Sequence, residues 1–165
     1  MTDTDRPRRA SVAWARYRRM RQILDAAVAR DLERECDLSL PEYEVLAAME
    51  STEDQCIRVS ALADRMGWAH SRLSRQLGRM QRRGLIGREP CDLDGRGDDV
   101  VFTDAGTSLL RTAAVAHRDA VERHFTDALT ERQLDELTAI AESIDDHRAS
   151  GAETRPRTEP DTPSA

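Results

Sequence analysis

The sequence predicts a mainly α-helical fold with one small β-hairpin. Apolar residues recur at helical spacing along most of the 165-residue chain, whereas only residues 85–89 and 98–102 have the pattern of strands. The loop between these strands, 90–97, is rich in Asp and Gly and therefore indicates a hairpin. Aromatic residues make up only 4% of the chain and Ala is abundant, which favours closely packed helices around a thin core.

The first two helices are predicted before residue 51. Apolar residues at intervals of three and four indicate a helix from Val12 to about Arg34. A second helix begins at Ser39-Leu40-Pro41-Glu42, where the serine can cap, the proline suits the first turn and the glutamate can close a capping box. We expect residues 1–10 and 149–165 to be disordered, because both segments are polar and lack periodicity.

Two shorter helices are predicted over about 60–66 and 69–83, and they are followed by Gly67 and Gly84. Glycine best tolerates the left-handed conformation that closes a helix. Beyond the hairpin, Thr103 or Asp104 would cap a long helix to about residue 129.

The last helix begins with the capping box Thr130-Glu131-Arg132-Gln133 and ends near His147. The order is therefore four helices, a hairpin and two helices. The hairpin and the three helices before it form a winged helix-turn-helix over about 39–106. The outer helices, about 12–34 and 104–147, flank it within a domain that spans 11–148.

Charge is distributed unevenly along the chain. The formal net charge of −6 argues against nucleic-acid binding only if the charge is uniform. Between Arg58 and Pro90 lie eight arginines and two acidic residues, so this segment carries +6 and the remainder −12. Every basic residue is an arginine. The planar guanidinium of arginine suits phosphates and base edges, which favours a nucleic-acid partner. The alternative explanation is a GC-rich coding sequence, which would replace lysine by arginine throughout the chain.

The helix over 69–83 carries most of this positive charge. At about 100° per residue, Leu73, Leu77 and Met80 form a narrow buried side, and five arginines fall on the far side. Five arginines without a carboxylate repel one another unless they face an anion, although an unusual solvated face is the alternative. In a helix-turn-helix this second helix enters the major groove. We expect base contacts from His70, Ser71, Arg72, Ser74, Arg75 and Gln76, and phosphate contacts from Arg79, Arg82 and Arg83.

Several motifs resemble one known family. Ala61-Leu62-Ala63 with Gly67, Ser71 to Arg75, Arg79-Met80 with Gly84-Leu85-Ile86, and Asp94-x-Arg96 with Phe102-Thr103-x-x-Gly106 resemble the MarR family of bacterial transcriptional regulators. Phe102 replaces the leucine usual in that family. The resemblance covers about Val12 to His147.

The resemblance implies a homodimer in which the first and the last two helices of each chain interlock. It also implies that Arg96 enters the minor groove of double-stranded DNA and that Asp94 orients Arg96. The long apolar stripe after Gly106 independently favours a partner chain. The leading interpretation is a ligand-responsive repressor on a pseudo-palindromic operator. The alternatives are a winged-helix module for protein–protein contact and a redox-responsive regulator that uses Cys91 or Cys36.

Family members often release DNA when a small aromatic or anionic molecule binds between the dimer helices and the winged domain. The candidates for such a site are Trp14, Tyr17, Arg18, Arg21, Tyr43 and His117. Packing in the dimer is the alternative role of the aromatic residues. Acidic neighbours should raise the pKa of Cys36 and blunt its reactivity.

Other classes of protein lack support in the sequence. The chain shows no phosphate-binding glycine loop, nucleophile elbow or paired catalytic carboxylates, so we expect neither an enzyme nor a cofactor. Histidines and cysteines lack the spacing of metal ligands. No signal peptide or membrane span is predicted, which favours a cytoplasmic protein with reduced thiols.

Overall fold

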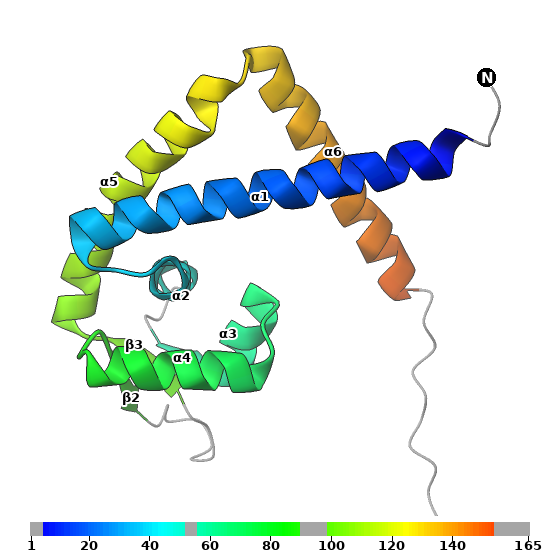
Figure 1. Ribbon diagram of the computed structural model, residues 1–165. Helices are drawn as coiled ribbons and strands as arrows, with labels where there is room; N and C mark the ends of the chain where they lie inside the picture. Colours follow the sequence, from blue (N-terminus) through cyan, green and yellow to red (C-terminus); the bar gives the residue numbers. More distant parts are fainter. Residues whose placement is uncertain (1–4, 52–55, 90–98, 154–165) are drawn as a thin grey trace, which may run out of the picture. The chain divides into compact units, whose positions relative to one another are not determined.

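The computed structural model describes residues 5–51, 56–89 and 99–153, the last three by their backbone alone (Figure 1). The chain divides into two compact units, Met1–Phe125 and Thr126–Ala165. The first unit contains α1 (Arg6–Cys36), α2 (Leu40–Glu50), β1 (Cys56–Arg58), α3 (Val59–Met66), α4 (His70–Arg82), β2 (Ile86–Glu89), β3 (Asp99–Phe102) and α5 (Asp104–His124). The second contains a 3₁₀ turn over Thr126–Ala128 and α6 (Glu131–Glu153). The mainly helical fold with a small β element is confirmed.

The strands form a three-stranded antiparallel sheet in the order β1-β3-β2. The predicted hairpin of β2 and β3 is confirmed, with Ile86 opposite Phe102. Sequence reasoning missed β1, because its three residues are too few to show an alternating pattern. Its strand geometry depends on pairing with β3, where Ile57 lies opposite Val100.

The predicted helix caps are present. The carboxylate of Glu42 accepts hydrogen bonds from the Ser39 backbone N–H at 3.0 Å and from the Ser39 hydroxyl at 2.7 Å. Gly67 (φ 61°) and Gly84 (φ 72°) are both left-handed, as the ends of α3 and α4 require. In the second unit, the side-chain oxygen of Gln133 accepts a hydrogen bond from the Thr130 backbone N–H.

Several helix bounds differ from those expected. Residues 6–10 belong to α1 and were expected to be disordered; Pro7 is tolerated in the first turn, where its missing N–H costs no helical bond. Residues 149–153 likewise continue α6 beyond the expected end near residue 147. α5 ends at His124, not near residue 129, because Phe125 leaves the helical region with φ −123°. Residues 1–4 and 154–165 lie outside the described chain.

The core of the first unit lies where the end of α1, helices α2 to α4, the sheet and α5 meet. Leu32, Leu46, Leu62, Leu77 and Val100 contribute one fully buried side chain each from five of these elements. The N-terminal part of α1 behaves differently, because all of residues 6–23 are exposed. A helix gains most of its stability from packing, and the described residues leave this apolar stripe on α1 uncovered.

The cysteines also depart from expectation. Cys36 is free and half-buried, but Cys56 at the start of β1 is disulfide-bonded, which contradicts the expectation of reduced thiols. Cys91 lies outside the described residues. Scattered cysteines carry no sequence signal for pairing, since pairing depends on the segments that the fold brings together. Among the described helices, none is both long and apolar enough to cross a membrane.

Candidate nucleic-acid interface

The fold separates α4 into a buried side and an exposed side. Leu73, Leu77 and Met80 are completely buried, as the helical wheel predicted. The outward side exposes His70, Ser71, Arg72, Arg75, Arg79 and Arg82, and Ser74 is half-buried beside them. Because the apolar stripe anchors α4 in the core, the arginine-rich side projects from the winged helix. This arrangement can present several guanidinium groups to one extended anion.

A tight turn joins α3 to α4. Gly67 closes α3, and the Trp68 N–H then donates to the carbonyl of Ala63 at 3.0 Å. Ala69 occupies the N-cap of α4 without a side-chain acceptor, so the helix start relies on backbone bonds such as that from the Arg72 N–H to the Ala69 carbonyl, 2.9 Å. The first turn of α4 also contains no acidic residue, so no carboxylate there competes with an external anion for the backbone amides.

The five arginines of α4 and its C-cap fall into two groups. Three of them contact other side chains: the Arg72 guanidinium lies 3.8 Å from the centre of the Trp68 ring, Arg79 donates to the side-chain oxygen of Gln76, and Arg83 donates to Glu42 and Asp37. By contrast, Arg75 and Arg82 make no ion pair or hydrogen bond with any described residue. These two side chains are the most available for an external partner.

Two expected DNA contacts occupy positions that do not fit their expected roles. Gln76 was expected to read a base, but only 4% of it is exposed. Arg83 was expected to contact phosphate, but its guanidinium pairs with the buried Glu42 at 2.9 Å. Both lie at the border between the two sides of α4, where a helical wheel cannot tell inward from outward side chains.

The wing residues Asp94 and Arg96 lie outside the described residues. The strands that lead to them are described: Glu89 at the end of β2 lies opposite Asp99 at the start of β3. Asp99 is buried, and its Oδ1 lies 3.9 Å from the Arg58 Nε of β1. The sheet thus places Glu89 and Asp99 opposite each other on β2 and β3, and β3 alone also pairs with β1.

Within the single chain, the six candidate effector residues fall into two groups. Tyr43 of α2 and His117 of α5 stack with ring centres 4.3 Å apart. Burial lowers the pKa of His117 and raises the pKa of Tyr43, whose phenol also lies near the charge of Glu50. The other four, Trp14, Tyr17, Arg18 and Arg21, are exposed on the N-terminal part of α1, where the Trp14 and Tyr17 rings stack at 5.6 Å.

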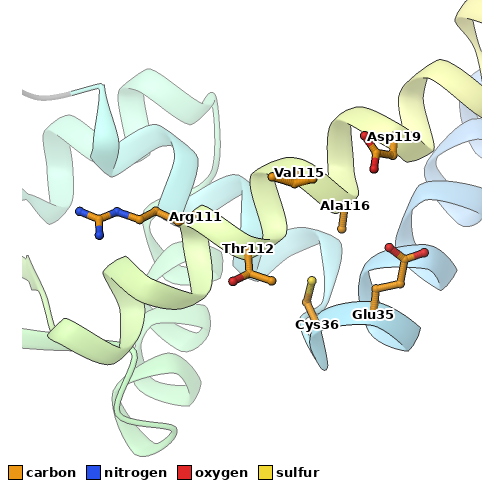
Figure 2. Close-up of a pocket in the computed structure, with 7 residues that line it drawn as sticks. All are labelled: Glu35, Cys36, Arg111, Thr112, Val115, Ala116 and Asp119. Atoms are coloured by element: carbon orange, nitrogen blue, oxygen red, sulfur yellow. The ribbon is translucent and has the colours of Figure 1, made fainter.

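A pocket of about 500 Å³ opens between the end of α1 and α5 (Figure 2). It is lined by Glu35, Cys36, Arg111, Thr112, Val115, Ala116 and Asp119. In Figure 2 the Cys36 thiol points across the gap toward α5, whereas the Arg111 guanidinium points away from it. Burial, and then the charge of Glu35, raise the pKa of the Cys36 thiol, in line with the expected low reactivity. Within the described ranges, no group of three or more His, Cys, Asp or Glu side chains could hold a metal ion.

Sequence reasoning missed two polar clusters. One joins Arg83 to Glu42 and Asp37 across 41 and 46 residues of sequence. The other surrounds the buried Asp31 of α1, which pairs with Arg34 at 2.8 Å and with Arg123 and His124 of α5. The one sequence signal for this second cluster was Asp31 itself, an acidic residue on the apolar side of α1, because a buried charge requires partners.

Comparison with known proteins identifies the family. AbsC, a MarR family transcriptional regulator from Streptomyces coelicolor, is 32% identical, with 91% of this chain and 97% of that one covered and a TM-score of 0.77. This chain belongs to the MarR family. The sequence model of the MarR family matches residues 37–97. The chain is therefore a MarR family transcriptional regulator.

Two further MarR structures are similar. Sco3205, a MarR family regulator from Streptomyces coelicolor solved in complex with DNA, is 28% identical, with 83% of this chain and 86% of that one covered and a TM-score of 0.76. A mutant of MarR from E. coli, complexed with operator DNA, is 21% identical and supports the fold alone, with coverages of 78% and 89% and a TM-score of 0.71. Comparison with curated proteins gave no match.

The MarR-like motif at the start of α5 has a clear packing role. The Thr103 hydroxyl accepts from the Gly106 N–H at 3.0 Å and donates to the Gly84 carbonyl at 2.7 Å. A Cβ on Gly106 would lie 1.9 Å from the Leu85 carbonyl oxygen. The motif therefore fixes the first turn of α5 against Gly84 and Leu85, which lie between α4 and β2.

Proposed function

We propose that this regulator binds double-stranded DNA sequence-specifically, with α4 in the major groove. The observation that carries the proposal is the outward side of α4, where Arg75 and Arg82 are exposed and have no partner among the described residues. Arg75, near the N-terminal end of α4, is suited to a guanine edge with Ser71 beside it. Arg82, at the C-terminal end, is suited to a phosphate.

The wing contributes the second part of this proposal. Arg96 enters the adjacent minor groove and Asp94 orients it, as the family resemblance implies. The paired ends of β2 and β3 support this role, because Glu89 and Asp99 hold the two ends of the segment together. Replacement of Arg96 by alanine should weaken binding chiefly at operators with A·T-rich flanks.

The protein acts as a homodimer. Large apolar side chains are exposed on α1, where Trp14 is 60% and Ile23 55% exposed, and on α6, where Ile140 and Ile144 are each 56% exposed. Apolar surface of this kind favours cover by a partner, and a second copy is the natural one for a symmetric regulator. Two-fold symmetry implies a pseudo-palindromic operator with half-sites about one helical turn apart.

The dimer acts as a repressor that a small molecule releases. Occupancy of two adjacent half-sites blocks access to the DNA between them, which suits repression. The α1–α5 pocket of about 500 Å³ falls within the size range of small-molecule sites. Cys36 in this pocket immediately precedes Asp37, which is bonded to Arg83 at the end of α4, so a bound molecule would act on the DNA-binding helix. A releasing compound should lose its effect on a Thr112→Trp variant, which fills the pocket.

Selection of bound fragments from a random DNA pool tests the proposal. The parent protein should enrich one pseudo-palindromic sequence, and Arg75→Ala should enrich a sequence relaxed at particular base pairs. Gln22→Ala, a change on α1, is the matched control and should select the parent sequence. A pool that remains random with the parent would favour the alternative role in protein–protein contact.

A further inference from the structure

Arg83 connects three helix ends in the first unit. It caps the C-terminus of α4, and its guanidinium donates to both carboxylate oxygens of Glu42, at 3.1 and 2.9 Å. Its second terminal nitrogen donates to the Asp37 carbonyl at 2.6 Å and to the Asp37 carboxylate at 3.1 Å. Glu42 lies in the first turn of α2, and Asp37 is the C-cap of α1. In Figure 1, α4 lies on the opposite side of α2 from α1.

Each partner of Arg83 is itself held in place. The side chain of Glu42 is 7% exposed and also accepts two hydrogen bonds from Ser39. Asp37 has φ 50°, the left-handed conformation that ends α1. The corner between α1 and α2, formed by Asp37 and Glu42, therefore has a fixed geometry. The planar guanidinium of Arg83 can bond the Glu42 carboxylate and the Asp37 carbonyl at the same time.

We infer that Arg83 is a positioning residue: it fixes the C-terminal end of α4 against the corner between α1 and α2, and so sets the angle at which α4 meets DNA. This inference rests on the proposed DNA-binding function and names a residue that acts on it through contacts within the protein. Four hydrogen bonds hold the Arg83 guanidinium in this corner, so its charge is neutralised locally. The adjacent Arg82 is exposed and makes no comparable contact with the described residues.

The two roles of an arginine near DNA differ in their salt dependence. Each lost phosphate contact lowers the slope of log K against log salt by about 0.9, so a substitution present in both subunits of the dimer lowers it by about two. Loss of a positioning contact weakens binding but leaves this slope unchanged, because the number of neutralised phosphates stays the same. A positioning contact also couples to its partner, so two changes in the same pair are less than additive.

The experiment measures operator affinity of the full-length protein over a range of KCl concentrations. Arg83→Gln and Glu42→Gln should each weaken binding about tenfold or more with the parent slope, and the double variant should bind no more weakly than the weaker single variant. Arg82→Gln is the matched control and should lower the slope by about two, because each subunit of the dimer loses one phosphate contact. Arg83→Lys keeps a cation beside the buried Glu42 and so preserves folding, yet it cannot bridge both partners. It should still weaken binding several-fold with the parent slope.

The contrary outcomes are distinct. If Arg83→Gln lowers the slope by about two, one contact per subunit, while Glu42→Gln binds as the parent does, Arg83 is a phosphate contact. If Arg83→Lys binds with parental affinity, the bridging geometry has no role and the inference is wrong. A parent protein that selects no DNA overturns the proposed function and this inference together, whereas either of the first two results overturns the inference alone.

Discussion

Gly106 packs against the main-chain carbonyl of Leu85 so closely that a Cβ at this position would lie 1.9 Å from the carbonyl oxygen. The same carbonyl is 3.5 Å from the Thr103 N–H. Backbone atoms cannot move aside as a flexible side chain can, so the start of α5 requires glycine here. This contact joins the first turn of α5 to Leu85, which lies between α4 and β2.

Substitution of Gly106 by alanine should therefore destabilise the protein. The added methyl group has to displace the backbone of Leu85, and overpacking of this kind costs about 1–3 kcal/mol or more. Urea denaturation followed by circular dichroism measures the change. Gly78→Ala is the control: its Cβ would meet only the end of Arg82 at 3.8 Å, so helix propensity should stabilise this variant by about 0.5–1 kcal/mol. Equal stabilities of the two variants would contradict the packing role.

Asp31 should stabilise the junction of α1 and α5 only while it is ionised. The hydrogen bond from His124 is the largest influence on its pKa, which lies below the ordinary value, and Arg34 and Arg123 act in the same direction. Because the folded pKa is the lower one, this stabilisation is present above the ordinary Asp pKa of 3.8 and is lost as the pH falls through the folded value.

Asp31→Asn should accordingly unfold at a lower urea concentration than the parent at pH 7, and the difference should shrink below about pH 4. Asp25→Asn is the matched control, because Asp25 is exposed and lies 4.0 Å from Arg21 on the same helix. Exposed pairs of this kind contribute about 0.3–0.5 kcal/mol. A gap between parent and Asp31→Asn that stayed constant down to pH 3 would show that charge is not the cause.

His117 should make the fold less stable in mild acid. Burial against Tyr43 lowers its pKa from 6.5, so the unfolded chain binds the proton more readily. The stability tied to the neutral ring is complete above about pH 6.5 and declines as the pH falls toward the folded pKa. His117→Phe keeps a ring beside Tyr43 and should lose less stability than the parent between pH 7 and pH 5, as thermal unfolding would reveal. Parallel pH profiles of the two proteins would count against this assignment.

A charge on the exposed apolar stripe of α1 should disrupt the dimer. Tyr17 is 46% exposed and stacks on Trp14, so Tyr17→Asp would place a carboxylate in the proposed interface at a cost of several kcal/mol. Sedimentation equilibrium at micromolar concentration should give a dimer for the parent and a monomer for this variant. Gln22→Asp, roughly 140° away around the helix, should remain dimeric. A monomeric parent would refute the proposed interface.

Local patterns predicted most of the fold. The boxes at Ser39 and Thr130 and the glycines at 67 and 84 marked helix ends correctly, because capping depends on a few neighbouring residues. Strand β1 was missed because its geometry comes from pairing with a strand about 40 residues later. The helix break at Phe125 likewise has no glycine or proline to announce it.

The outward arginines of α4 could be predicted from the sequence, but their division of roles could not. The apolar stripe through Leu73, Leu77 and Met80 fixes which side of α4 faces the core. Whether Gln76 is buried and Arg83 pairs with other helices depends on the neighbouring elements. Glu42, the partner of Arg83, is 41 residues away in the sequence, and no periodicity within α4 contains that information.

Recognition of DNA by the outward side of α4 is tested most directly by fluorescence anisotropy with the selected operator and a scrambled duplex of equal length at fixed salt. The parent should bind the operator at least about 10³-fold more tightly than the scrambled duplex. Arg75→Ala should lose about 1–3 kcal/mol of that discrimination per half-site while remaining dimeric. Equal binding of both duplexes by the parent, or full discrimination by Arg75→Ala, would contradict recognition through this side of the helix.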